Sequence, residues 1–186
     1  MGKETKMLDR DIEKILVSEA EIREICADLG EQITNDYKGK TPLIIGLLKG
    51  CMPFMSELMK HIDLYCEIDL MGVASYHGGV ASSGDVKITK DLDNPVLNKD
   101  VILAEDIVDT AKTIDVVRKL LLYRGARSVE VVTLLDKPEG RTVEFEPKYI
   151  GRTIPKEFVV GFGLDYDEKY RNLPYVGVLK PSVYKK

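Results

Sequence analysis

The sequence predicts an α/β domain with a central, mainly parallel sheet flanked by helices. Apolar runs long enough for fully buried strands recur along the chain, each followed by a polar turn, at residues 43–48, 101–104 and 129–135. Apolar residues at helical spacing follow the first two of these turns. Because ligands bind outside the carboxyl ends of the strands in open parallel sheets, the turns after these runs are the candidate sites.

The composition is typical of one soluble domain spanning residues 1–186. The hydrophobic fraction of 44% is ample for a core, and the net charge of −4 does not suggest a surface for nucleic acid or membranes. No apolar run approaches the roughly 20 residues that span a bilayer. The charged segment Met1–Arg10 lacks the apolar centre of a signal peptide, so we expect a cytoplasmic protein.

The chain has 3 cysteines, an odd number without zinc-binding spacing, at Cys26, Cys51 and Cys66. Cys26 falls on an apolar helix face, and Cys66 precedes a strand-like run. Free cysteine is among the most buried residue types, so we expect buried, reduced thiols.

The first helix is expected to begin at a capping box, with Ser18 as N-cap and Glu21 at the third helical position. Gly39 is the expected stop. Between them runs one apolar stripe, made of Ile22, Ile25, Cys26, Leu29 and Ile33. The stripe predicts a helix that covers the sheet and carries no chemistry of its own.

A candidate anion site follows the run 43–48, where Lys49 and Gly50 lead into an apolar helix around residues 54–59. Glycine permits close approach of the backbone, and a helix start offers unpaired N–H groups. The alternative is an ordinary solvated loop lysine.

The next expected strand is Cys66–Ser75, and the loop Tyr76–Gly84 follows it. The glycines and serines of this loop cannot pack a core, which indicates a mobile loop. Its position suits a lid that excludes water during a reaction. The alternative is a plain hairpin connection to a strand at residues 86–88.

The stretch Val101–Thr113 carries the clearest chemical signal. Three carboxylates, Glu105, Asp106 and Asp109, follow the buried run, and the hydroxyl-rich start of a helix comes next. Carboxylates can accept hydrogen bonds from sugar hydroxyls or share a divalent cation with phosphates, and the helix start can bind a phosphate. The alternative is a set of helix caps or a solvated turn.

The remaining strands complete the expected sheet. The run 129–135 ends at Asp136-Lys137-Pro138, and residues 139–146 look like polar surface. Short strand-like pieces at 149–151 and 158–160 are expected to build a small subdomain, and residues 173–179 to form the last strand. Phe158 is a candidate for stacking on a flat ligand, or an ordinary core residue.

These segments resemble a known family. Glu105-Asp106-Ile107-Val108-Asp109-Thr110, after a Val-Ile-Leu strand, resembles the phosphoribosyl-pyrophosphate signature of type I phosphoribosyltransferases. The segments 136–138 and 158–166 are similar to the purine-salvage branch, the bacterial hypoxanthine-guanine phosphoribosyltransferases. The resemblance extends from about Ser18 to Leu179. It implies the type I phosphoribosyltransferase fold, with a small hood over the base site formed by the N-terminal and C-terminal segments.

The resemblance also implies a reaction and its participants. A 5-phosphoribosyl group would pass from phosphoribosyl pyrophosphate to hypoxanthine or guanine, giving IMP or GMP and pyrophosphate, with Mg²⁺ as cofactor. Asp109 would take the proton from the purine ring. The family further suggests a homodimer or homotetramer.

The binding roles that the resemblance implies fall into three groups. Pyrophosphate would be bound by Lys49, Gly50 and Arg171, with a cis peptide before Lys49, while Ser75 and Tyr76 close over the ribose-phosphate. Ribose and Mg²⁺ would be held at Glu105, Asp106 and Ile107, and the 5′-phosphate at Thr110, Ala111, Lys112 and Thr113. The purine would meet Lys137 at O6, Phe158 and Val159, with Asp165 near its position 2 and a second Mg²⁺.

Ala111 departs from the family, which usually has Gly at this position. If the position requires a positive φ, an L-residue costs roughly 1–2 kcal/mol. If its angles are helical, the methyl group crowds the phosphate instead. Either case predicts weaker phosphate binding than glycine would give.

Two other functions stay open on the sequence. An RNA-binding regulator on the same fold, like the pyrimidine-operon attenuator, would need a basic face, and this chain is acidic overall. An enzyme of the same fold could use adenine, xanthine or orotate. Lys137 argues against adenine, because an ammonium group donates hydrogen bonds but cannot accept one from an amine.

Overall fold

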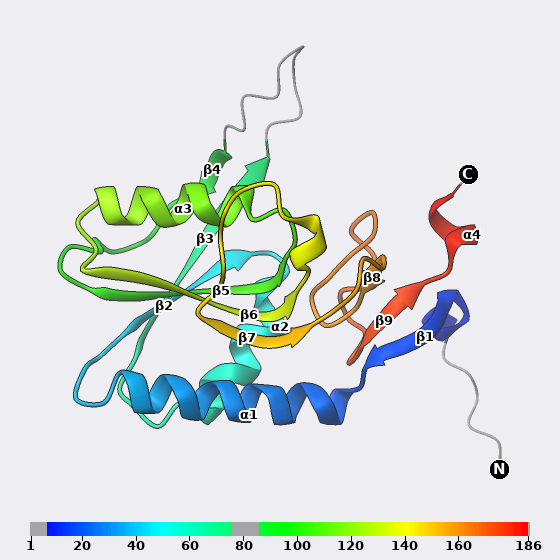
Figure 1. Cartoon of the computed structure of the whole chain (residues 1–186), viewed down its shortest axis with the longest axis horizontal. Helices are drawn as coiled ribbons and strands as arrows, with labels where there is room; N and C mark the ends of the chain where they lie inside the picture. The colour runs from blue at the N-terminus through cyan, green and yellow to red at the C-terminus, as the bar shows by residue number, and fades with distance from the viewer. Residues whose placement is uncertain (1–6, 76–85, 186) are drawn as a thin grey trace.

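The computed structural model describes residues 7–75 and 86–185 of the chain. Its centre is a six-stranded sheet in the order β4-β3-β2-β5-β6-β7, in which only the β3–β4 pair is antiparallel (Figure 1). The strands are β2 (Leu43–Leu48), β3 (Glu67–Ser75), β4 (Val86–Lys90), β5 (Asp100–Val108), β6 (Ser128–Asp136) and β7 (Tyr149–Thr153). The expected mainly parallel α/β sheet is therefore confirmed.

Helices cover both faces of this sheet, because alternate side chains of a strand point to opposite faces. Ile44 and Ile102 pack in one hydrophobic cluster with α1 (Glu19–Asp36) and α2 (Cys51–Leu58). Leu43 and Ile45 pack in a second cluster with α3 (Lys112–Tyr123). Figure 1 shows α1 and α3 on opposite sides of the sheet. The apolar runs are thus buried from both sides, as their lack of polar residues predicts.

The start of α1 is the expected capping box. The Glu21 amide donates to Ser18 Oγ at 3.3 Å, and the Ser18 amide donates to Glu21 Oε2 at 2.8 Å. The hydrogen bonds to Ser18 lower the pKa of Glu21 to about 2. The helix ends at Asp36, and Gly39 lies in the turn beyond it with φ +78°.

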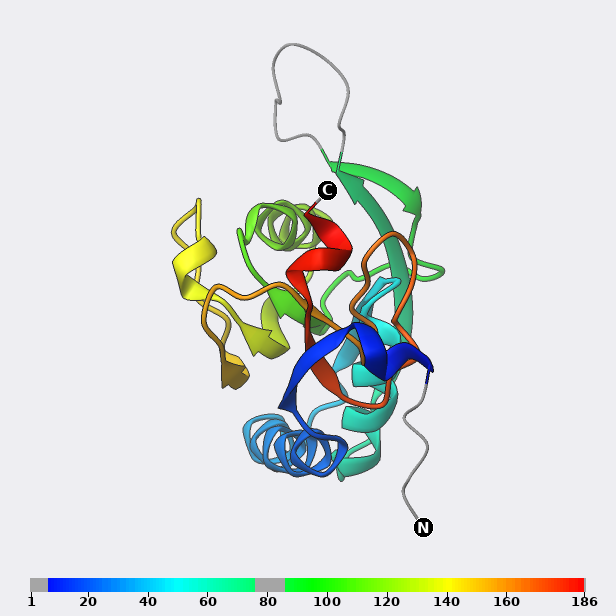
Figure 2. The ribbon, with the colours of Figure 1, turned by 90° about the vertical axis from the view of Figure 1, so that its right-hand side faces the viewer.

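A second, antiparallel sheet forms the hood, in the order β1-β9-β8. Its strands are β1 (Ile12–Val17), β8 (Val159–Val160) and β9 (Val176–Leu179), so they come from both ends of the chain. Three short elements complete the described structure outside the sheets: η1 (Met7–Asp11), η2 (Met59–His61) and η3 (Pro138–Gly140). A last helix, α4 (Pro181–Tyr184), follows β9 and lies at the same end of the molecule as β1 and β8 (Figures 1 and 2).

Two sequence expectations about this region were wrong. Residues 149–151 do not help to build the hood but belong to β7, which pairs with β6 in the main sheet. The last strand is shorter than expected, because residues 173–175 precede β9 in a turn where the Leu173 amide donates to the Tyr170 carbonyl. Neither strand β1 nor helix α4 was anticipated.

The cysteines are free thiols, as expected. Cys26 and Cys51 are fully buried, and Cys66 is half-buried. Burial raises the pKa of both Cys26 and Cys51 to about 12, so these thiols are protonated and unreactive. In the described part of the chain, no helix has the length and apolar character to cross a membrane.

Candidate active site

The site lies where the chain order of the main sheet reverses. From the neighbouring strands β2 and β5, the chain moves outward to β3 on one side and to β6 on the other. Such a switch point leaves a crevice at the carboxyl ends of the strands. Here the Lys49-Gly50 turn meets the acidic turn, defined as residues 105–109 at the end of β5. The two are in contact, since a β-carbon on Gly50 would overlap the Asp106 carboxylate. The peptide before Lys49 is cis, as the resemblance implied.

Glu105 and Asp106 are neighbouring carboxylates in a desolvated position at the end of β5. Burial, together with the neighbouring Asp106, raises the pKa of Glu105 well above its usual value. Burial also raises the pKa of Asp106 to about 6, although the Ile107 amide donates to Asp106 Oδ1 at 2.8 Å. Neither carboxylate forms an ion pair with a described residue. A divalent cation would supply the missing positive charge, so the donor set fits Mg²⁺.

The protein supplies only part of a metal's coordination shell. Within residues 7–75 and 86–185, no group of three or more His, Cys, Asp or Glu side chains is arranged to hold a metal ion. Asp165 is close enough to Asp106 to raise its pKa, but the two do not form a closed cage. Mg²⁺ usually keeps several waters and binds through one or two carboxylates plus substrate phosphates, which agrees with this arrangement.

A hollow of about 280 Å³ opens beyond the end of β5. It is lined by Val73, residues 105–111, Thr113 and Ile114. Helix α3 begins here without a side-chain cap, so its first N–H groups can receive an anion. Ala111 precedes the helix with φ +62° and ψ 1°, in the left-handed region. The first of the two alternatives for Ala111 is therefore confirmed, and the position favours glycine.

Asp109 and Lys137 form an ion pair at the rim of this hollow. Asp109 Oδ2 and Lys137 Nζ are 3.0 Å apart, and the aspartate side chain is 44% exposed while the lysine is only 12% exposed. Gly140 makes this arrangement possible, because a β-carbon there would overlap the Asp109 carboxylate. The loop after β6 thus leaves the carboxylate accessible and the ammonium group recessed beside it.

Arg141 is a site residue that the sequence did not reveal. It donates to the carbonyls of Val108 at 2.7 Å and Asp109 at 2.6 Å, and it pairs with the buried Asp136 carboxylate. These contacts fix the backbone at Asp109. Residues 139–146 look polar in the sequence, and no local pattern distinguishes this arginine from a surface residue.

The hood contributes cationic and acidic groups from the loop after β8. Gly163 has φ +102°, and a β-carbon there would overlap the Gly50 carbonyl oxygen, so this loop touches the Lys49-Gly50 turn. Arg171 Nη2 lies 2.9 Å from Asp165 Oδ1, and Arg171 Nη1 donates to the Gly163 carbonyl at 2.7 Å. The candidates Asp165 and Arg171 therefore lie together in a loop that touches the distant Lys49-Gly50 turn.

Glu168, which the sequence did not single out, links the two cations of the site. Its carboxylate lies 2.9 Å from Lys49 Nζ and 3.3 Å from Arg171 Nη2. The hydrogen bond from Lys49 is the main cause that lowers the pKa of Glu168. Lys49 and Arg171 can thus hold one anionic group between them.

The remaining candidates lie at the edges of the site. Phe158 is 40% exposed beside the buried strand residue Val159. Thr110 and Lys112 are exposed at the start of α3, and Thr113 is half-buried. Ser75 is the last residue of β3, whereas Tyr76 and the rest of the expected lid, through Gly84, lie outside the described residues.

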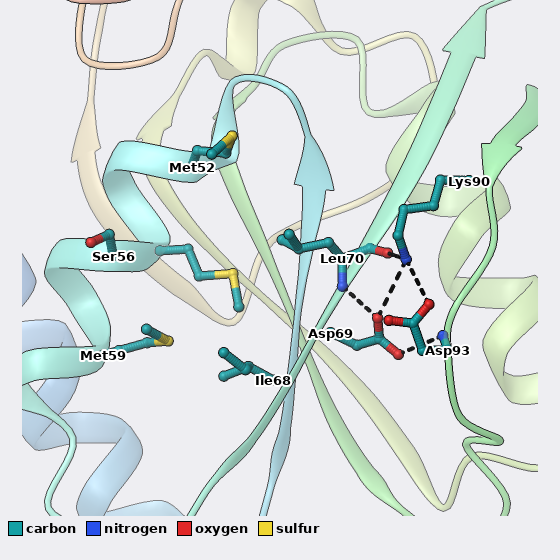
Figure 3. A pocket seen from close by; sticks show the side chains of 9 residues that line it. Met52, Ser56, Met59, Ile68, Asp69, Leu70, Lys90 and Asp93 are labelled. Carbon is teal, nitrogen blue, oxygen red and sulfur yellow. Dashed lines mark hydrogen bonds and ion pairs between the residues drawn. The ribbon is translucent and has the colours of Figure 1, made fainter.

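A second hollow, of about 310 Å³, lies between α2 and β3 and is mostly apolar (Figure 3). Its one buried carboxylate, Asp69, accepts hydrogen bonds from the amides of Leu70 at 2.7 Å and Asp93 at 2.9 Å. Lys90 Nζ lies 3.8 Å from the same carboxylate. These groups satisfy one another, so this hollow offers no reactive group comparable to those at the end of β5.

Known proteins similar to this chain carry consistent names. The phosphoribosyl transferase domain family matches residues 13–167. A hypoxanthine-guanine phosphoribosyltransferase of Lactococcus lactis is 59% identical over 97% of this chain and 98% of that protein. One of Streptococcus pyogenes is 57% identical over 97% of this chain and 100% of that protein.

The solved structures agree. A crystal structure of a hypoxanthine phosphoribosyltransferase from Staphylococcus aureus superimposes with a TM-score of 0.95 and 49% identity, covering 99% of this chain and 100% of that one. The relatives are enzymes, which favours an enzyme over the RNA-binding regulator. The chain therefore belongs to the phosphoribosyltransferase family, in its hypoxanthine-guanine branch.

Proposed function

We propose that this protein transfers the 5-phosphoribosyl group from phosphoribosyl pyrophosphate to hypoxanthine, guanine or both, and releases pyrophosphate. The observation that carries the proposal is the Asp109–Lys137 pair beside the acidic turn. A 6-oxopurine presents a carbonyl oxygen next to a ring nitrogen. An ammonium donor and a carboxylate acceptor 3.0 Å apart match those two neighbouring atoms.

The ribose and its 5′-phosphate occupy the turn from Glu105 to Thr113. Glu105 and Asp106 accept hydrogen bonds from the ribose hydroxyls, and the backbone at Ile107 supports them. Thr110, Lys112 and Thr113 donate to the phosphate together with N–H groups at the start of α3. The left-handed Ala111 supports this assignment, because it turns the backbone sharply between Thr110 and Lys112.

The leaving pyrophosphate is held by Lys49, Gly50 and Arg171. Negative charge grows on it as the bond to C1 of the ribose breaks, and fixed cations stabilise that charge most when water is excluded. Glu168 forms ion pairs with both of these cations. We expect the pyrophosphate group to displace Glu168 from Lys49 and Arg171, because the more highly charged anion competes better for the same donors.

The purine lies between the hood and the end of β6. Phe158 stacks on its face, Val159 meets it through backbone groups, and Asp165 lies near its position 2. Lys137 donates to O6 while Asp109 accepts the ring proton. General-base action of this kind is worth about 10²–10⁴-fold in rate.

Mg²⁺ is the proposed cofactor, held by Glu105 and Asp106 and, for a second ion, Asp165. When bound, it neutralises the charge of the pyrophosphate and orients it for departure. The burial that raises the pKa of Glu105 and of Asp106 supports this role, since a bound cation would stabilise their charged forms.

A spectrophotometric assay with four bases tests the proposed specificity. Hypoxanthine, guanine, xanthine and adenine are each offered with phosphoribosyl pyrophosphate and Mg²⁺. We expect turnover of hypoxanthine, guanine or both, and none of adenine, because a site built around one polar contact strongly rejects an analogue that leaves it unpaired. Turnover of adenine would contradict the role of Lys137. Absence of turnover with salt-sensitive RNA binding would favour the regulator.

We also propose that the protein forms a homodimer or homotetramer in the cytoplasm. The apolar hollow of Figure 3 supports association, because Met52 and Ile68 on its rim are 55% and 58% exposed. A second copy of the chain would cover them. Light scattering measures the mass in solution, and Ile68→Lys should shift it toward the monomer. A wild-type mass equal to one chain would contradict this proposal.

A further inference from the structure

The C-terminal helix α4 lies against the ring that we propose stacks on the purine. Tyr184, its last residue, stacks on Phe158 with ring centroids 4.8 Å apart and an interplanar angle of 21°. The Tyr166 ring lies roughly perpendicular to the Phe158 ring, with centroids 5.7 Å apart and an interplanar angle of 84°, and its centroid lies 6.4 Å from that of Tyr184 at 66°. The three rings form a compact aromatic group at the edge of the hood.

Helix α4 is fixed to the hood rather than free to move away. The Lys180 amide donates to the Asp11 carbonyl at 2.9 Å, and Lys180 Nζ donates to the Arg10 carbonyl at 2.6 Å. Val183 and Tyr184 pack on the small hydrophobic cluster of Ile12, Val160, Tyr170, Leu173 and Leu179. The last residues of the chain therefore hold Tyr184 in a defined place.

Phe158 is not enclosed by the two tyrosines. The Tyr184 ring lies along one face of the Phe158 ring and the Tyr166 ring lies roughly perpendicular to it, yet Phe158 remains 40% exposed. Phe158 therefore keeps surface that a flat ligand can contact. The backbone behind the ring is also fixed, because the Leu179 amide donates to the Phe158 carbonyl at 2.9 Å.

We propose that Tyr184 is a positioning residue for the purine site, which holds the Phe158 ring along one face while the exposed surface of that ring receives the base. Offset-stacked aromatic pairs are favourable beyond the area they bury, so Tyr184 restricts the ring to the orientation that stacking needs. The last helix of the chain then belongs to the base-binding site. This inference rests on the proposed stacking role of Phe158.

Steady-state kinetics of Tyr184→Leu test the proposal. Leucine keeps an apolar contact with the hood cluster but removes the flat ring face. We expect the KM for the purine to rise by about twofold to tenfold, the range that an aromatic pair predicts. The KM for phosphoribosyl pyrophosphate and kcat should stay near the wild-type values. Tyr184→Phe should restore the purine KM, because it restores the ring.

Tyr123→Leu is the matched control, since Tyr123 ends α3 and is 90% exposed. It should leave all three constants unchanged. An unchanged purine KM in Tyr184→Leu would overturn the inference. A lowered purine KM would also overturn it, because that result means that Tyr184 occupies the place of the purine.

A double-mutant cycle with Phe158→Ala separates this inference from the proposed function. If Tyr184 acts through Phe158, Tyr184→Leu should add nothing to the purine KM once Phe158 is alanine. An equal further rise in that background would show that Tyr184 acts elsewhere. If Phe158→Ala alone leaves the purine KM unchanged, the stacking role in the proposed function is wrong and the inference falls with it.

Discussion

The ribose-phosphate side of the site comes from one continuous stretch, Glu105–Thr113, whereas the purine side is assembled from segments far apart in the chain. The first side needs only a strand, a turn and a helix start on the main sheet. The second needs β1 to pair with β9, and β9 with β8, before Phe158 and the loop to Arg171 can face the site.

The difference follows from what each half must recognise. A phosphorylated sugar is bound by backbone N–H groups and carboxylates, which one turn at the end of a parallel strand supplies. A flat base needs walls on several sides, and one turn cannot supply them. The rate of the chemical step should therefore depend on the residues at the end of β5, and the affinity for the purine should depend on the folded hood.

The largest effect should come from Asp109→Asn, which removes the proposed base but keeps its shape. We expect kcat to fall by about 10²–10⁴-fold, the usual worth of a general base. Binding of phosphoribosyl pyrophosphate with Mg²⁺, measured by calorimetry, should change little, because Asp109 lies beyond the ribose carboxylates. A variant with wild-type turnover would remove Asp109 from its role.

Gly140→Ala should impair chemistry without unfolding the protein. A methyl group at residue 140 overlaps the Asp109 carboxylate, which is the movable end of a side chain, so Asp109 shifts while the backbone stays. Displacing a catalytic group by about 1 Å can lower the reaction rate by about 10²-fold. We expect a fall in kcat of that order.

Thermal unfolding should distinguish this displacement from a loss of structure. We expect the melting temperature of Gly140→Ala to stay close to that of the wild type. Normal kcat in this variant would show that the position of Asp109 is not critical. A large fall in melting temperature would show instead that the loop after β6 had been disrupted.

Tyr170→Phe should affect only the hood side. The Tyr170 hydroxyl donates to Asp11 Oδ2 at 2.8 Å and joins the loop after β8 to the N-terminal segment. Its loss should lower the free energy of unfolding by about 1.5–3 kcal/mol, because the bond is to a charged group. The purine KM should rise a few-fold and the KM for phosphoribosyl pyrophosphate by less, because Lys49 and Gly50 of the pyrophosphate site lie outside this loop. Equal rises in both constants would contradict the division into two sides.

Ala111→Gly should give the smallest effect, in the favourable direction. Relief of the left-handed strain is worth roughly 1–2 kcal/mol, and the greater freedom of glycine in the unfolded chain offsets about 0.4–1 kcal/mol of it. We expect a net gain in unfolding free energy of between about 0 and 1.6 kcal/mol. The KM for phosphoribosyl pyrophosphate should also fall, whereas unchanged kinetics would show that the methyl group is tolerated.

The parts of the molecule that could be predicted from the sequence are those encoded locally. The capping box at Ser18, the Lys49-Gly50 turn and the strand–turn–helix at Glu105–Thr113 each rest on neighbouring residues. The convergence of Lys49 with the acidic turn comes instead from the sheet, in which strands β2 and β5 are parallel and adjacent.

The parts that could not be predicted depend on contacts between distant residues. Strand β1 is defined by its pairing with β9 near the other end of the chain. The strand-like piece at 149–151 gives no sign of which sheet it joins, and it was assigned to the wrong one. Arg141 and Glu168 look like solvated charges until the fold brings Asp109 and Lys49 beside them.

The most direct test of the account is a crystal structure of the protein with Mg²⁺ and a purine nucleoside 5′-monophosphate. We expect the ribose hydroxyls on Glu105 and Asp106, the phosphate at residues 110–113, and the base against the exposed surface of Phe158 with O6 at Lys137. A nucleotide whose ribose lies away from the acidic turn would contradict the account.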